Sequence, residues 1–211
     1  SLDSRRILLS SLDLTLPSGA QLVVTAQDDL QMLALFRATA GLWPSGQGKI
    51  RRPGIEDVLF LPERPYWPPG ILRNALLRSG RELTTSDSEI LAVLDALGLR
   101  KTLDRVGGLD TERDWNAALS ISEQHLFSIA RLTLANPKIV FLDRPGSSLP
   151  LHAISGALEL FRQRSISVVL MSANGETSLP FDFFLDIQKD GQWLTGPHKP
   201  EYYLEHPRTA S

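Results

Sequence analysis

Runs of apolar residues that alternate with amphipathic stretches of helical spacing constrain the fold of this chain most. The runs at Leu22–Thr25, Ile139–Leu142 and Ser167–Met171 show no polar–apolar alternation. Strands of this kind are buried on both faces, as in a parallel sheet that helices cover on each side. The succession of such strands and helices therefore predicts an α/β fold with a mostly parallel sheet.

Further elements follow from the same patterns. Other strands are predicted at Ile7–Leu9, Leu12–Leu16, Val58–Leu61 and Phe183–Ile187. The first two would form antiparallel strands at the N-terminus. Helices are predicted at Leu30–Ala40, Ile71–Leu77, Asp87–Leu97, Ser122–Leu134 and His152–Arg164. The tail after Trp193 contains several Pro and Gly residues and is expected to be irregular.

The middle of the chain, about residues 64–135, has helical signals and almost no strand signal. This predicts a helical lobe inserted into one α/β domain that spans residues 1–211. Two helix starts, Ser86 with Glu89 and Ser120 with Glu123, have the S-x-x-E spacing of a capping box.

Composition limits the function classes. The chain has 22 Lys and Arg against 24 Asp and Glu, so its net charge of −2 gives no electrostatic case for a nucleic-acid partner. It has 0 Cys, which excludes disulfides, thiolate metal sites and cysteine nucleophiles within it. We expect no metal site. No apolar run approaches the roughly 18–20 residues of a membrane span, and no secretory leader is visible.

Four segments, in this order, resemble the ATP-binding domains of ABC transporters. They contain TAQDDLQMLALFRATAGLWPSGQGKI (residues 25–50), VLFLPERPYWPPGILRNAL (58–76), LSISEQHLFSIARLTLANPKIVFLDRPGSSLP (119–150) and SVVLMSANGETSL (167–179). The residues of these segments most resemble the branch fused to peroxisomal fatty-acyl exporters and their bacterial peptide-uptake relatives. The resemblance implies an ABC-type P-loop ATPase core, a helical lobe that couples to a transmembrane partner, and ATP held between two such domains.

The chain departs from the family pattern at the phosphate loop, which normally reads G-x-x-x-x-G-K-[ST]. Laid on this pattern, residues 26–33 are Ala26, Gln27, Asp28, Asp29, Leu30, Gln31, Met32 and Leu33. Both glycines, the lysine and the Mg²⁺-binding hydroxyl are therefore replaced. Asp28 and Asp29 would repel a polyphosphate, although as first residues of a helix they also suit its dipole.

The other chemical positions of the family pattern are also changed. Asp143 matches the Mg²⁺-organising Asp, but Arg144 follows where the catalytic Glu belongs, and Arg cannot act as a base. Glu63 stands at the usual Gln, and Ala173 at the switch His. The partner-facing signature retains Ser120, Glu123 and Gln124, while Ser122 replaces a Gly; Ser120 and Glu123 are equally explained as a capping box.

The sequence therefore predicts a degenerate, pseudo-ATPase nucleotide-binding domain that serves an ABC transporter as a structural or regulatory unit. Its partners would be a transmembrane domain and a second nucleotide-binding domain, at the cytoplasmic face of the membrane. No cofactor is expected to bind tightly. One alternative is a genuine, slow ATPase that binds ATP and Mg²⁺. It would use Asp143 and Glu63 for the metal ion, or would complete a normal partner's site through Ser120 and Glu123. Another is a soluble binding protein that has reused the fold.

One contact is predicted inside the altered site. Arg144 would carry a permanent positive charge to the place where nucleotide and metal normally meet. We expect it to pair with Asp28, Asp29 or Asp143, because an unpaired buried charge is costly. The competing expectation is that Arg144 extends into solvent.

Overall fold

The computed structural model describes residues 7–43, 45–78, 84–172 and 176–199. Its main sheet has six strands in the order β2-β5-β6-β1-β7-β8. All neighbouring pairs are parallel except β7 and β8, which are antiparallel. The strands are β1 (Gln21–Ala26), β2 (Val58–Leu61), β5 (Ile139–Asp143), β6 (Ser167–Met171), β7 (Phe183–Ile187) and β8 (Trp193–Pro197). The mixed α/β fold with a mostly parallel sheet is thus confirmed.

Helices cover both faces of this sheet. On one face α1 (Asp29–Thr39) packs its Met32 against Leu22 and Val24 of β1. On the other face α7 (Leu151–Gln163) joins a cluster that contains Val23 of the same strand. Successive residues of β1 therefore enter opposite cores, which explains the lack of alternation in its sequence.

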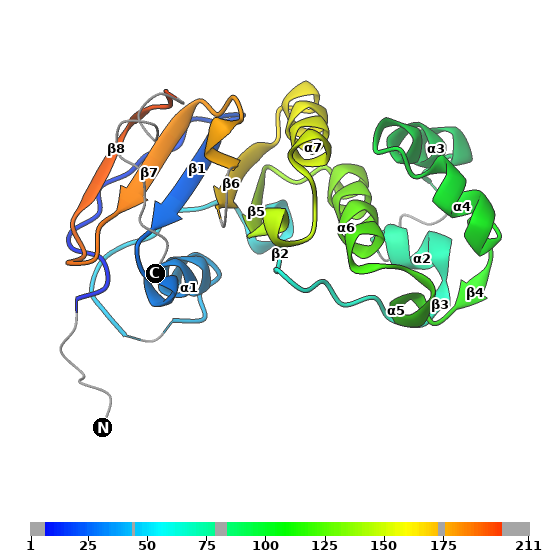
Figure 1. Ribbon diagram of the computed structural model, residues 1–211, viewed down its shortest axis with the longest axis horizontal. Coiled ribbons are helices and arrows are strands. Elements are labelled where there is room, and N and C mark those ends of the chain that lie inside the picture. Colours follow the sequence, from blue (N-terminus) through cyan, green and yellow to red (C-terminus); the bar gives the residue numbers. More distant parts are fainter. Residues whose placement is uncertain (1–6, 44, 79–83, 173–175, 200–211) are drawn as a thin grey trace.

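Helices fill most of the chain between β2 and β5, and they extend away from the sheet (Figure 1). They are α2 (Leu72–Leu76), α3 (Asp87–Ala96), α4 (Arg100–Val106), α5 (Trp115–Ala118) and α6 (Ile121–Ala135). A two-stranded antiparallel ribbon, β3 (Gly70–Ile71) with β4 (Glu112–Arg113), lies at their far end. Short 3-10 turns complete the chain: η1 (Ile55–Asp57), η2 (Pro145–Ser147) and η3 (Glu176–Ser178).

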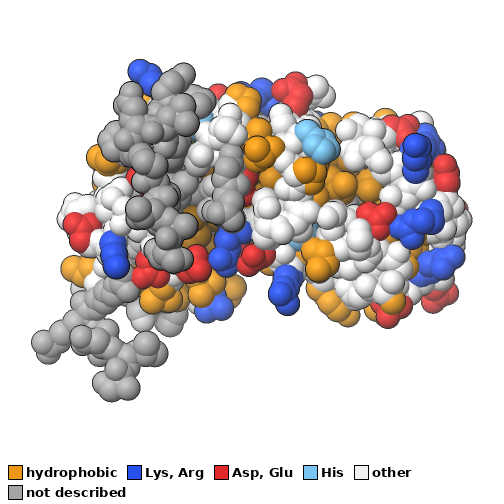
Figure 2. Space-filling view, in the orientation of Figure 1, with side chains coloured by type: hydrophobic (Ala, Val, Ile, Leu, Met, Phe, Trp, Pro, Cys, Tyr) orange, Lys and Arg blue, Asp and Glu red, His pale blue; other side chains and the backbone are white. Residues whose placement is uncertain are grey.

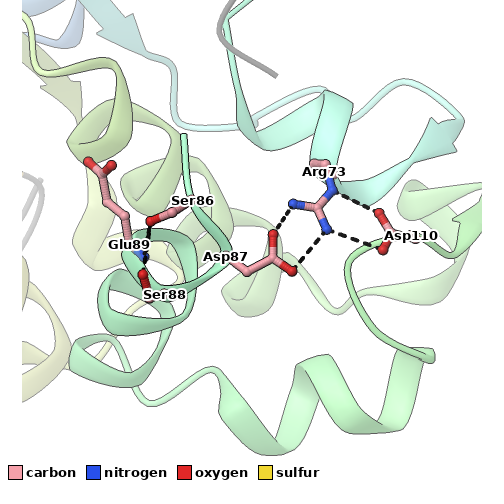
Figure 3. Close-up of polar contacts among 6 residues, drawn as sticks. All are labelled: Arg73, Ser86, Asp87, Ser88, Glu89 and Asp110. Atoms are coloured by element: carbon pink, nitrogen blue, oxygen red, sulfur yellow. Dashed lines mark hydrogen bonds and ion pairs between the residues drawn. The ribbon is translucent and has the colours of Figure 1, made fainter. Parts of the chain in front are cut away.

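Charged side chains stabilise the surface of this helical region. Arg73 of α2 lies between Asp87, at the start of α3, and Asp110 (Figure 3). The hydrogen bonds that the Arg73 guanidinium donates to Asp110 and Asp87 raise its pKa. Side chains of both signs lie next to one another over α3 and α4 (Figure 2); Arg100 and Asp95 form one such pair, at 2.7 Å.

Two predictions about the chain ends are wrong. Residues 7–20 contain no strand: Ser11 has a φ of 48°, and the segment meets the β7–β8 turn through the bond from Ser10 N to Gly191 O (2.8 Å) rather than a ladder. The residues after Trp193 are not irregular at first, because residues 188–192 form a hairpin turn that pairs β8 with β7. Pro197 ends that strand.

None of the helices in the described ranges is long and apolar enough to cross a membrane.

Candidate functional site

The turn between β1 and α1 is short. Only Gln27 and Asp28 separate Ala26, the last residue of β1, from the first residue of α1. Asp28 is the N-cap: its Oδ1 accepts from the backbone N–H of Leu30 at 2.8 Å. The N–H groups of Gln31 and Met32 donate to the backbone carbonyl of Asp28 at 3.0 and 3.4 Å. Three donors at the start of this helix, the N–H groups of Leu30, Gln31 and Met32, therefore already have acceptors within the chain.

Two side chains of the same segment serve packing. Gln31 is 1% exposed, and its Nε2 donates to the carbonyls of Leu8 (2.9 Å) and Gln188 (2.7 Å). Met32 is 6% exposed and lies in the apolar cluster between α1 and the sheet. These positions, the second glycine and the lysine of the family pattern, thus hold α1 to the N-terminal segment and the sheet.

Arg144 meets three carboxylates beside this turn, and we name these four residues the Arg144 cluster. Its guanidinium lies 3.2 Å from Glu63, 3.4 Å from Asp143 and 3.5 Å from Asp29. The contacts with Asp143 and Asp29 agree with the pairing predicted from the sequence. Asp28 instead caps α1, and the shortest contact, with Glu63, was not anticipated. The competing expectation, an Arg144 side chain in open solvent, is wrong, since only 27% of it is exposed.

The backbone of Arg144 is fixed in an unusual conformation. Its φ of 46° and ψ of 52° place it in the left-handed region, which costs energy for a residue with a Cβ atom. Its N–H donates to the carbonyl of Met171 (2.9 Å), and its carbonyl accepts from the backbone N–H of Ser147 (3.1 Å). These bonds hold the residue at the carboxyl edge of the sheet, between β5 and η2.

The charges in the Arg144 cluster do not balance, because one guanidinium faces three carboxylates. Burial raises the pKa of Asp143 above its usual value, the charge of Arg144 opposes this rise, and Glu63 adds to it. The Arg144 Nε, although 3.4 Å from Asp143, makes no aligned hydrogen bond. Because Arg144 cannot accept a proton, the position next to Asp143 provides no general base.

The signature positions are engaged within the same chain. Ser120 and Glu123 form a complete capping box at the start of α6. Glu123 also accepts from Arg105 (2.8 Å) and Thr102 (3.0 Å). Gln124 is buried, and its Nε2 donates to the Leu119 carbonyl (3.0 Å).

A polar contact ties the start of α6 to the segment after β5. The Ser122 hydroxyl donates to the Ser148 carbonyl (2.6 Å), and the Ser148 hydroxyl contacts Nδ1 of His125 (2.8 Å). His125 is fully buried, and this burial lowers its pKa, although the Ile121 carbonyl and Glu63 partly oppose the effect.

Sequence reasoning missed Glu176, which is 0% exposed. Its carboxylate accepts from the Gly146 N–H and the Ser172 hydroxyl, each at 3.0 Å. A Cβ on Gly146 would lie 2.1 Å from that carboxylate, so this glycine permits the contact. No spacing or motif marks Glu176 in the sequence. Ala173, at the switch His position, lies outside the described residues.

The described ranges contain no group of three or more His, Cys, Asp or Glu that could hold a metal ion. The Arg144 cluster does contain three carboxylates, but the guanidinium stands among them.

The chain is similar to known ATP-binding proteins of transporters. It is 32% identical over 198 residues to an uncharacterized ABC transporter ATP-binding protein of Synechocystis, which covers 92% of this chain and 30% of the relative. It is 28% identical over 200 residues to the human lysosomal cobalamin transporter ABCD4, and this match covers 90% of this chain and 33% of the transporter. The chain thus spans about a third of the length of these relatives. No family model matches.

One solved structure extends the similarity to the fold. A bacterial Atm1-family ABC exporter with ATP bound superposes with a TM-score of 0.78 at 19% identity. The match covers 99% of this chain and 39% of the exporter chain.

Proposed function

Because this chain is a homologue of ABC transporter ATP-binding proteins and has the fold of their nucleotide-binding domain, we propose that it is a degenerate nucleotide-binding domain. In this proposal it neither binds Mg-ATP tightly nor hydrolyses it. It serves as a structural or regulatory partner of a transmembrane domain at the cytoplasmic face of the membrane, beside a second nucleotide-binding domain.

The β1–α1 turn carries this proposal. A phosphate loop needs backbone N–H groups that converge on the ligand from outside the helix. Here the helix begins at Asp29, and the N–H groups of Leu30, Gln31 and Met32 are bonded to Asp28. A phosphate at this place would have to displace those bonds.

The side chains around the turn do not fit a Mg-nucleotide either. The lysine position is occupied by an apolar side chain in the core, Met32. Asp29 projects its carboxylate, which is 92% exposed, beside the turn, and Arg144 stands among the carboxylates that would otherwise face a metal ion. We therefore derive no catalytic step through nucleotide or metal.

The connection after β2, residues 62–69, is the surface we assign to the transmembrane partner. Tyr66 on it is 72% exposed, and large exposed aromatic side chains are common anchors in protein interfaces. A hollow of about 440 Å³ adjoins it, lined by Pro68, Asn74, Ala75, Leu77, Arg78 and Arg131.

Calorimetric titration with Mg-ATP and a phosphate-release assay test the nucleotide part of the proposal. We expect no saturable binding in the micromolar range and no turnover, since loss of single catalytic groups commonly lowers rates by about 10²–10⁴. The Asp143→Asn variant is the control for contaminating ATPase. Turnover that this substitution abolishes would establish a slow ATPase instead.

A further inference from the structure

Residues 62–69, the connection after β2, are called the β2–α2 connection below. Four prolines and two anchors define its conformation. Pro62, Pro65, Pro68 and Pro69 restrict its backbone. At its far end the Trp67 side chain is fully buried, and its Nε1 donates to Ser128 Oγ (2.9 Å) and to the carbonyl of Gln124 (3.1 Å).

The near end of the connection has a different anchor, the contact of Glu63 with Arg144 at 3.2 Å. Tyr66 lies between the two anchors, with its side chain exposed. Trp67 is held by the helical region, whereas Glu63 is held by the edge of the sheet. The conformation of the residues that present Tyr66 therefore depends on both.

Arg144 is suited to hold Glu63 because the backbone of Arg144 is fixed. Its N–H donates to the carbonyl of Met171 in β6, and the N–H of Gly146, two residues further along, donates to buried Glu176. A left-handed conformation at a residue other than glycine persists when its surroundings determine it. The guanidinium thus starts from a rigid base and reaches Glu63 from the opposite segment.

We propose that Arg144 is a positioning residue that holds the β2–α2 connection in one conformation without a nucleotide, so that Tyr66 is permanently presented to the transmembrane partner. This inference rests on the proposed function for the identity of the partner. The ordering of the connection by Arg144 is a property of the isolated chain and is measurable without the partner.

The test uses a spin label at Tyr66→Cys, which is specific because the chain has 0 Cys. The label's mobility and the amide exchange of residues 63, 64, 66 and 67 are measured in the parent and in the Arg144→Ala and Glu63→Gln variants. Arg100→Ala is the matched control, since Arg100 pairs with Asp95 away from the connection. No nucleotide is present.

We expect both variants to increase label mobility and to speed amide exchange in the connection by up to about fivefold, the effect of losing one partly exposed ion pair. Exchange in α3 should stay unchanged in these variants, and the Arg100→Ala control should match the parent in the connection. Unchanged mobility and exchange in folded Arg144→Ala would overturn the inference. If that variant does not fold, Glu63→Gln decides, because Glu63 is partly exposed. A change on adding Mg-ATP to the parent would contradict the proposed function and not this inference.

Discussion

At the residue scale, Met32 shows that more has changed in the altered loop than the loss of one lysine contact. Its side chain is packed in the core rather than directed to a ligand, and the neighbouring Gln31 is bonded to two carbonyls. Restoring the family's lysine would therefore not restore its environment.

We predict that Met32→Lys alone will not produce Mg-ATP binding. The acidic residues and the bonded N–H groups remain, and the new ammonium must leave the core. The variant should instead lose about 2–4 kcal/mol of unfolding free energy, as for a buried charge. Urea unfolding and calorimetric titration measure the two effects. Leu30→Lys is the control on the same helix, where the side chain is 40% exposed and the loss should stay within about 0.5 kcal/mol. Saturable nucleotide binding by Met32→Lys would refute our account of the loop.

At the element scale, the contact between α6 and the segment after β5 depends on a neutral histidine. His125 is buried with Nδ1 near Ser148 and Ile121, while its Nε2 has no aligned hydrogen bond. The nearby Glu63 would favour the charged ring, but burial outweighs it and lowers the pKa.

Acid should therefore destabilise the protein through His125. The unfolded chain takes up a proton near the ordinary pKa of about 6.5 while the folded chain does not, so stability falls as pH drops, by at most about 1.4 kcal/mol per unit. Urea unfolding at pH 7.5 and 5.5 should show a smaller loss for His125→Gln than for the parent. The exposed His152→Gln variant should keep the parental loss, and an equal loss in all three proteins would contradict the assignment.

Asp143 affects the stability in the opposite direction. Because its pKa is raised in the folded chain, protonation of Asp143 in acid stabilises the folded state.

Elements with a clear apolar period could be predicted from the sequence, and those that depend on distant contacts could not. The five predicted helices and the strands β1, β2, β5, β6 and β7 were located to within one residue at each end. Strands β3 and β4 and helices α4 and α5 were not predicted, because short elements depend on packing more than on propensity. In the site, Arg144 was expected to meet acids because the family pattern places it opposite the phosphate loop, where Asp28 and Asp29 stand. The contact of Arg144 with Glu63 depends on the path of the β2–α2 connection, which no local sequence pattern specifies.

On the scale of the whole molecule, one apolar cluster joins the helical region to the sheet. It contains Trp67 and Leu72 on one side and Leu61, Val140 and Leu142 of the strands on the other. Unfolding the helices alone would expose this shared surface to water, at about 25 cal/mol for each Å² of apolar area. The helical region therefore shares its apolar core with the sheet.

We therefore predict a single cooperative unfolding transition. The double variant Trp43→Phe/Trp193→Phe leaves Trp67 and Trp115, both fully buried in the helical region, as the fluorescent reporters. Circular dichroism of the same variant reports on helices and strands together. Urea transitions followed by the two signals should coincide, with unfolding free energies that agree within about 10–15%. The two removed tryptophans are only partly buried, so the variant should fold, and the parent followed by circular dichroism serves as its control. A fluorescence transition at clearly lower urea would mean that the helical region unfolds first, and that the shared cluster contributes less than its burial indicates.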